Sequence, residues 1–421
     1  MTGEQLLQAW SQGRIVPLPG PAPRDRQALA AAIGPAGLDN LERCWGPGVV
    51  LGSGGSSASR SGGRRWCLQP LAHLEASAAA TGGWLEACGL EPARCLHLNA
   101  LPLHHVSGLL PLVRSRLWRA DQLALDPAWL RDPAQLLAAV ELPADRPVLL
   151  SLVPTQLHRL MARPQAVAWL RRLAVIWIGG APLAGELAGR ARRAGLRLAP
   201  CYGATETAAM VCALAPEQFL AGAGGCGQPL ADVRLRLDPA SGAIELQAGR
   251  LSPGWLEAGG LRPLPRCPEG WWCSGDGGRW DGDGLSVLGR LDGALHSGGE
   301  TVFPEQLEQR LLAVARAEGL ALQALLLLAR DDPEWGQQLV ALVRPAPATS
   351  AAAAQALLQR LAQICRGWAA AERPRRWQLC PTLAPTPLGK WQRGRWRAWL
   401  DELEAEHIPP AGAVDVNPLG E

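Results

Sequence analysis

The sequence has 421 residues, of which 48% are hydrophobic and 19% are charged, and its net charge is +3 at pH 7. This length allows two or three domains with cores of their own, and the composition is typical of a globular protein. The near-neutral charge, without a long run of one sign, argues against nucleic-acid binding, and no apolar run is long enough to span a bilayer. Because the first residues, MTGEQLLQAW, lack the layout of a signal peptide, we expect a cytoplasmic protein.

Two residue types are unusually rare. The 41 basic residues include a single lysine, Lys390, and the chain has a single tyrosine, Tyr202. A lysine kept among so many arginines indicates a position that needs a compact charge rather than a planar guanidinium, although chance survival is the alternative. The 11 cysteines form no C-x-x-C pair, which favours reduced thiols over disulfides or a zinc site.

The N-terminal part contains a candidate phosphate loop. Residues 1–45 alternate helical stretches with a Pro/Gly-rich link at 17–23, and a short strand at 49–51 leads into the Gly/Ser/Arg-rich segment from Ser53 to Arg65. The backbone amides of such a segment can cradle phosphates, whereas the alternative is a flexible linker. The preceding strand, the arginines and an amphipathic segment at 68–80 favour the phosphate loop.

Two adjacent histidines, His104 and His105, follow an apolar strand near residue 101. A histidine at such a position is either a core or capping residue or part of a ligand pocket.

Three further strands are expected at 147–152, 173–178 and 196–199, and helices separate them. Strands that alternate with helices and end in Gly-rich turns predict a mostly parallel, doubly wound α/β sheet whose ligands bind beyond the carboxyl ends of the strands. Two of these ends carry chemically suggestive turns, at 179–181 and at 202–207.

The segment after the third strand reads Tyr202-Gly203-Ala204-Thr205-Glu206. Tyr202 offers a flat face for adenine, Thr205 a hydroxyl for a phosphate, and Glu206 a hard oxygen ligand for Mg²⁺. Taken alone, a Thr-Glu pair after a turn is also typical of a helix cap.

A strand-rich section beginning at 233–246 predicts a small barrel-like subdomain that ends near Asp276. The glycines around Asp276 let the backbone approach a ligand, and its carboxylate could accept hydrogen bonds from two sugar hydroxyls. The alternative is an Asp-Gly turn between strands. Arg290 could reach the same hydroxyls or a phosphate, and Asp292 lies where a new unit begins.

The C-terminal part is expected to be a small α+β unit. Its helices are expected at 304–318 and 350–371, and its strands at 324–329, 339–343 and 376–380. The Gly298-Gly299-Glu300 turn is expected to open the first of these helices. A Pro-rich turn then presents Lys390, a basic helix follows, and the residues from 406 onward form a tail.

These motifs resemble those of the adenylate-forming superfamily of acyl-CoA synthetases, adenylation domains and luciferases. The family patterns T-G-D, G-R-x-D and G-G-E-x-x-x-P-x-E-[IL]-E are similar to residues 274–276, 289–292 and 298–308, with serine in place of the threonine. Y-G-x-T-E matches 202–206, and P-x-T-x-x-G-K is similar to the Pro-rich stretch that ends at Lys390, in which the proline directly precedes Thr386. The resemblance implies a large N-terminal domain over 1–291, shortened at its N-terminus relative to the family, a mobile lid over 292–405 and a tail over 406–421.

The resemblance also implies ATP, CoA and a carboxylic acid as substrates, Mg²⁺ as the cofactor, and specific residue roles. Lys390, Thr205 and Glu206 are expected to be catalytic, with Glu206 also the metal ligand. His105 and Gly180 are expected to line the acyl pocket, Asp292 to be the hinge, and Gly298 and Gly299 to shape the CoA tunnel. The residues expected to bind ATP or AMP are Ser53, Gly54, Gly55, Ser56, Ser57, Gly179, Gly180, Ala181, Tyr202, Gly203, Asp276 and Arg290.

The family loop S-G-[ST]-[ST]-G-x-P-K matches least well, because its Pro-Lys is absent here and either Arg60 or Arg64/Arg65 must replace the lysine. Within the superfamily the chain looks most like the o-succinylbenzoate-CoA ligases of menaquinone and phylloquinone biosynthesis. The alternatives are a ligase for another aryl or medium-chain acid and a non-catalytic nucleotide-binding relative. Members of this superfamily are often homo-oligomers.

Overall fold

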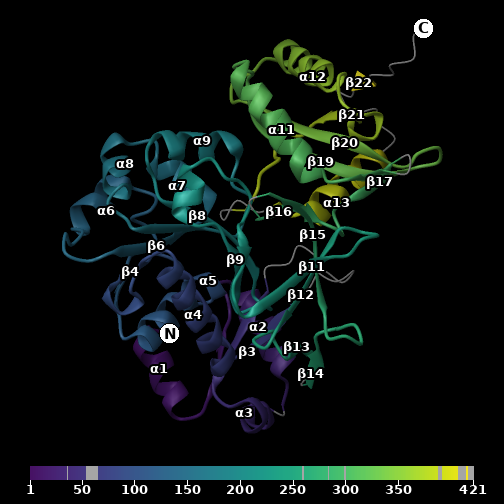
Figure 1. The fold of residues 1–421 in the computed structure, drawn as a ribbon. Helices are drawn as coiled ribbons and strands as arrows, with labels where there is room; N and C mark the ends of the chain where they lie inside the picture. The colour runs from purple at the N-terminus through teal and green to yellow at the C-terminus, as the bar shows by residue number, and fades with distance from the viewer. Residues whose placement is uncertain are drawn as a thin grey trace. The chain divides into compact units, whose positions relative to one another are not determined.

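The computed structural model describes residues 1–35, 37–53, 65–257, 260–282, 284–297, 300–386, 391–405 and 414–415 (Figure 1). Chain contacts define two compact units, the first formed by Met1–Ser274 and Gly278–Val287 and the second by Gly275–Gly277 and Leu288–Glu421. Asp276 therefore belongs to the same unit as Arg290. The expected boundary after residue 291 and its hinge function stay predictions.

A seven-stranded mixed sheet forms the centre of the first unit. Its order is β10 (Gln228–Pro229), β9 (Ala209–Ala213), β8 (Leu198–Ala204), β7 (Val175–Ile178), β6 (Val148–Leu152), β4 (Leu96–Asn99) and β5 (Asp121–Ala124). The strands from β8 to β5 are parallel, while β9 and β10 pair antiparallel at one edge. The predicted doubly wound α/β fold is confirmed, but β8 continues to Ala204 instead of ending at Ala199, because it pairs with β9.

Helices cover both faces of this sheet (Figure 1). They are α4 (Leu71–Ala87) and α5 (Val106–Trp118) on one face and α6 (Pro133–Ala139), α7 (Pro154–Leu160), α8 (Pro164–Leu170) and α9 (Gly185–Arg193) on the other. Side chains alternate along the strands, so that Leu150 joins the core under α6 to α9 while its neighbour Leu149 joins the core under α4 and α5. Helices α6, α7 and α8 each have proline in the first turn, where its missing N–H is not needed.

Two smaller sheets complete the first unit. One has the order β1 (Ile15–Leu18), β2 (Gly48–Gly52), β3 (Trp66–Pro70), β13 (Gly254–Glu257) and β14 (Gly260–Pro263). The other has the order β11 (Val233–Leu237), β12 (Ala243–Ala248), β15 (Trp272–Asp281) and β16 (Gly284–Arg290), and the latter two strands run on into the second unit. The remaining helices are α1 (Gly3–Ser11), α2 (Pro23–Ile33), α3 (Asp39–Trp45), the 3₁₀ turn η1 (Pro92–Arg94) and α10 (Pro216–Leu220).

The second unit is an α+β sandwich built on one sheet. The strands β18 (Glu300–Val302), β17 (Leu295–Ser297), β20 (Gly336–Pro345), β21 (Pro374–Leu379) and β22 (Val414–Asp415) are neighbours in this order, and β19 (Leu322–Asp332) pairs with β20. The helices are α11 (Pro304–Ala317), α12 (Ala351–Cys365), the 3₁₀ turn η2 (Ala370–Glu372) and α13 (Arg393–Ala405).

Two expectations for the second unit need correction. The helix expected from residue 304 does begin at Pro304, but Glu300 does not open it, because Glu300 belongs to β18, which pairs with β17. The long helix expected at 350–371 ends at Cys365 and is followed by η2. None of the helices in the described ranges combines the length and the apolar character that crossing a bilayer requires.

Candidate active site

The carboxyl ends of the parallel strands bring several expected site segments to one edge of the large sheet. His105 follows β4, Val153 follows β6, the 179–181 turn follows β7, and Thr205 follows β8. A Cβ added to Gly180 would lie 3.5 Å from Cγ1 of Val153, so the turns after β6 and β7 are in contact. This edge is where ligands bind in open parallel sheets.

The turn after β7 also contacts β8. Cys201 lies below Gly179, where an added Cβ would be 3.0 Å from its Sγ, and the thiol donates to the carbonyl of Ile178 at 3.5 Å. Burial raises the pKa of Cys201 to about 12, so this thiol stays protonated. Gly180 has φ of +79°, a conformation that favours glycine. The turn at 179–181 is therefore held close to the backbone of the Tyr202 segment.

Tyr202 and Gly203 lie within β8 rather than on a free turn. The Tyr202 side chain packs in the core under α4 and α5 and leaves 9% of its surface exposed. A Cβ on Gly203 would lie 2.1 Å from the backbone oxygen of Ala209 on β9, so this position accepts glycine only. The expected adenine contact thus depends on a largely buried ring.

Thr205 and Glu206 follow β8 and are anchored through their carbonyls. Gln69 donates from Nε2 to the carbonyl of Thr205 at 2.6 Å, and the N–H of Ser252 donates to the carbonyl of Glu206 at 2.7 Å. The indole Nε1 of Trp255 donates to Oε1 of Glu206 at 3.0 Å. Both residues are largely buried, so their backbone is fixed by these contacts, and Trp255 holds one carboxylate oxygen of Glu206.

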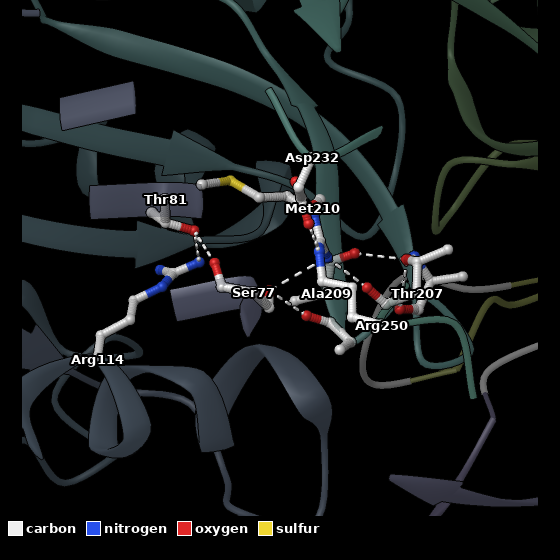
Figure 2. A network of polar contacts seen from close by, with 10 residues as sticks. Ser77, Thr81, Arg114, Thr207, Ala209, Met210, Asp232 and Arg250 are labelled. Atoms are coloured by element: carbon white, nitrogen blue, oxygen red, sulfur yellow. Dashed lines mark hydrogen bonds and ion pairs between the residues drawn. The ribbon is translucent and has the colours of Figure 1, made fainter. Parts of the chain in front are cut away.

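The next two residues have a strained backbone that a buried arginine stabilises. Ala208 and Ala209 have φ of +52° and +79°, which is unfavourable for residues with a Cβ. Figure 2 shows Arg250 pointing at this segment. Its Nη1 donates to the carbonyl of Thr207 at 2.5 Å and its Nη2 to that of Met210 at 3.0 Å. The guanidinium thus ties both ends of the strained pair.

A serine on α4 adds to this support. Ser77 donates from Oγ to the carbonyl of Ala208 at 2.5 Å and accepts from Nη1 of Arg250 at 3.2 Å (Figure 2). On the same helix, Thr81 accepts from Nη2 of Arg114 at 3.4 Å. Burial lowers the pKa of Arg114 to about 10. Buried hydrogen bonds from Ser77 and Arg250 therefore fix the backbone that directly follows Thr205 and Glu206.

His104 and His105 are partly buried, and their ring centroids lie 4.4 Å apart. His105 is the residue before the first turn of α5, and its carbonyl accepts the N–H groups of Gly108 and Leu109. A Cβ on Gly108 would lie 2.2 Å from the carbonyl of Pro102. The histidine pair is thus held by a tightly packed turn after β4.

The second unit brings together Asp276, Arg290 and Asp292. Arg290 donates from Nη1 to Oδ1 of Asp276 at 3.3 Å, and it binds Asp292 through Nε at 3.2 Å and Nη2 at 3.1 Å. Gly275 has φ of +78°, and a Cβ there would lie 2.7 Å from Nη2 of Arg290. Glycine at this position therefore allows the guanidinium to approach Asp276.

Several expected site residues lie outside the described residues: Gly54, Gly55, Ser56, Ser57, Arg60, Arg64, Gly298, Gly299 and Lys390. At the borders of the loop, Ser53 is buried and its N–H donates to the carbonyl of Arg65 at 2.9 Å.

Sequence reasoning missed Gln69, Arg250, Ser252 and Trp255. None of them belongs to a motif with a recognisable spacing, and each reaches the Thr205–Met210 segment from a distant part of the chain. The only signal in the sequence was an arginine in an otherwise apolar and Gly-rich stretch.

The residues present fit a magnesium ion that is held mainly by its substrate. Within the part of the chain that the structure describes, no three His, Cys, Asp or Glu side chains group as metal ligands. Mg²⁺ commonly binds through one or two carboxylates together with substrate phosphates. Glu206 uses Oε1 to accept from Trp255, and its second oxygen suits this kind of site.

Known proteins resemble parts of this chain in sequence. Residues 70–249 match the family described as AMP-binding enzyme. A 2-succinylbenzoate–CoA ligase of Salmonella typhimurium is 31% identical over 310 residues, which are 72% of this chain and 60% of the relative. A feruloyl-CoA synthase of Amycolatopsis is 31% identical over 259 residues, 59% of this chain and 51% of the relative. The chain thus spans half to three fifths of the length of these relatives.

Solved structures share the fold. One of them is the o-succinylbenzoate CoA synthetase of Bacillus subtilis in complex with its acyl-adenylate intermediate. It superposes on this chain with a TM-score of 0.67 at 21% identity, and the superposition covers 83% of this chain and 68% of the synthetase chain. Residues 70–249 are thus a region of the AMP-binding enzyme family, and the chain shares the fold of these solved structures.

Proposed function

We propose that this protein is an ATP-dependent, AMP-forming acid–CoA ligase whose substrate is o-succinylbenzoate. The observation that carries the proposal is the fixed placement of Thr205 and Glu206 beyond the carboxyl end of β8, anchored by Gln69, Ser252 and Trp255. The 31% identity to the Salmonella 2-succinylbenzoate–CoA ligase supports the choice of substrate.

In the first half-reaction the substrate carboxylate attacks the α-phosphorus of ATP, and acyl-AMP and pyrophosphate form. No general base is needed, because the nucleophile is already an anion. Negative charge develops on phosphate oxygens, which preorganised donors and cations stabilise. The Thr205 hydroxyl binds a phosphate oxygen, Lys390 and the loop at 53–57 bind the remaining oxygens, and Glu206 would hold Mg²⁺. When bound, Mg²⁺ would neutralise part of the negative charge of the phosphates.

The nucleoside is held by residues of other segments. Asp276 accepts hydrogen bonds from the ribose hydroxyls, and Arg290, which pairs with it at 3.3 Å, orients its carboxylate. The Tyr202 ring and the turn at 179–181 contact adenine. His105 and Gly180 line the acyl pocket.

In the second half-reaction the thiol of CoA displaces AMP from the acyl group. A rotation about Asp292 removes Lys390 and brings Gly298 and Gly299 to the CoA tunnel, as in the family that the motifs resemble. We also propose a cytoplasmic location and a homo-oligomeric state.

A ligase for another aryl acid is the second candidate, because the feruloyl-CoA synthase relative is also 31% identical. A non-catalytic nucleotide-binding relative is the third. The test measures pyrophosphate release from ATP after addition of o-succinylbenzoate, ferulate, benzoate or hexanoate. Pyrophosphate release with o-succinylbenzoate and with none of the other three acids supports the proposal. Release with one of the other acids instead overturns the choice of substrate. Absence of release with all four acids overturns the ligase activity.

A further inference from the structure

A buried tryptophan joins Glu206 to a neighbouring arginine. Trp255 is 3% exposed and donates from Nε1 to Oε1 of Glu206 at 3.0 Å. The guanidinium carbon of Arg65 lies 4.7 Å from the centroid of the same indole ring. Arg65 is the first described residue after the Gly/Ser-rich segment at 54–64. One side chain therefore contacts both an acidic and a basic candidate for the triphosphate site.

The sheet register accounts for this arrangement. On β13, which lies between β3 and β14, Trp255 pairs with Cys67 of β3 on one side and with Arg262 of β14 on the other. Arg65 lies two residues before Cys67, so it belongs to the same face of the sheet. The guanidinium carbon of Arg262 lies 5.2 Å from the Trp255 ring centroid. The ring thus lies between two cations, both at cation–π distance.

Glu206 lies on the same side of Trp255 as Cys67. Burial and then the charge of Glu206 raise the pKa of the Cys67 thiol well above its usual value, which places the carboxylate near this apolar wall. Glu206 as a whole residue is 8% exposed, so little water is available to fix the orientation of its carboxylate. The indole N–H is a donor only, so it holds one carboxylate oxygen without competing for a cation.

We propose that Trp255 is a positioning residue for phosphate binding, which orients Glu206 toward Mg²⁺ through its N–H and holds Arg65 through its ring as the cation that replaces the missing loop lysine. The inference rests on the proposed function, because it assigns a task to residues around the same nucleotide. It chooses Arg65 among the arginines that the sequence left open.

Two substitutions separate the two contacts. Trp255→Phe removes the N–H and keeps an aromatic ring, whereas Trp255→Leu removes both. Trp272→Phe is the matched control, because Trp272 is also a buried tryptophan of the first unit and belongs to the same hydrophobic core as Trp255. Arg65→Met removes the cation itself. Circular dichroism melts establish that each variant is folded.

The readouts are binding measurements. Electron paramagnetic resonance measures the affinity of the ATP complex for Mn²⁺. Calorimetry without metal ions measures the affinities for pyrophosphate and for AMP. For Trp255→Phe we expect a dissociation constant for Mn²⁺ about tenfold higher, as for the loss of a hydrogen bond to a charged group, with unchanged AMP and pyrophosphate binding. Trp255→Leu and Arg65→Met should in addition weaken pyrophosphate binding about fivefold. Trp272→Phe should change none of the three.

Each part of the inference can be overturned by one specific result. Parental Mn²⁺ affinity in Trp255→Phe overturns the role of the N–H, and parental pyrophosphate affinity in Arg65→Met overturns the role of Arg65. If Trp255→Leu does not fold, Trp255→Phe and Arg65→Met still decide both points. If the parent protein binds no Mn²⁺–ATP at all, the proposed function fails and this inference fails with it.

Discussion

Arg250 and Asp232 are joined by two hydrogen bonds in the first unit, from Nε to Oδ2 at 2.5 Å and from Nη2 to Oδ1 at 3.3 Å (Figure 2). The Arg250 side chain is completely buried, whereas that of Asp232 is one-third exposed. The Asp232 carboxylate therefore balances the charge of Arg250, whose other hydrogen bonds go to Ser77 and to the carbonyls of Thr207 and Met210. Asp232 at the surface thus helps to fix, through the guanidinium of Arg250, the conformation of the segment that carries Thr205 and Glu206.

Arg250→Met should lower the free energy of unfolding of the first unit by about 3 kcal/mol, because it leaves the carbonyls of Thr207 and Met210 without this donor and Asp232 without its partner. Urea denaturation measures the change. Arg236→Met is the control, since Arg236 pairs with Glu245 on the surface, where solvent screens the pair, and its loss should be clearly smaller. Equal losses in the two variants would show that the buried network has no special role.

Asp276→Asn should weaken AMP binding about tenfold or more, because an amide accepts hydrogen bonds from ribose hydroxyls less strongly than a carboxylate. Calorimetric titration with AMP measures the effect. Asp281→Asn is the matched control on the same strand, β15, where Asp281 pairs with Arg279 at the surface. Similar AMP affinities in both variants would contradict the ribose role.

Elements with strong local signals could be predicted from the sequence. The strands β6 and β7 were expected within two residues of their observed bounds, because short apolar runs there end in Pro- or Gly-rich turns. β1 was missed because Pro17 interrupts it, and its parallel pairing with β2 is not visible locally. Tertiary pairing likewise extends β8 through Tyr202.

The candidate site could be predicted only in part. The order of Tyr202, Thr205 and Glu206 was readable because motif residues lie next to one another in the chain. Their supports were not, since Ser77 and Arg250, which hydrogen-bond to each other, are 173 positions apart. Such contacts depend on the packing of the whole unit, for which a single sequence contains no local signal.

Glu308 should make the second unit less stable as the pH rises from about 4.5 to 7. Burial raises the pKa of its carboxyl to about 7, against the opposing effect of Arg393, whose Nη2 lies 2.9 Å from each carboxylate oxygen. In this pH range the folded state binds more protons than the unfolded state, so the free energy of unfolding falls with pH by up to about 1.4 kcal/mol per unit. Glu308→Gln should remove this part of the slope, as urea denaturation at several pH values can measure. Parallel pH profiles of parent and variant would contradict the assignment.

Lys390→Ala should reduce adenylation about 10²- to 10³-fold, because one preorganised cation is lost from the developing charge. It should leave thioester formation from supplied acyl-AMP and CoA nearly unchanged, since the proposed rotation removes Lys390 before that step. Pyrophosphate release and CoA-thioester formation from acyl-AMP measure the two half-reactions separately. Lys390→Arg tests whether charge alone suffices, and we expect it to remain impaired because a planar guanidinium cannot replace a compact ammonium on a crowded phosphate. An equal loss of both half-reactions in Lys390→Ala would make the lysine structural and would remove the basis for a rotating lid.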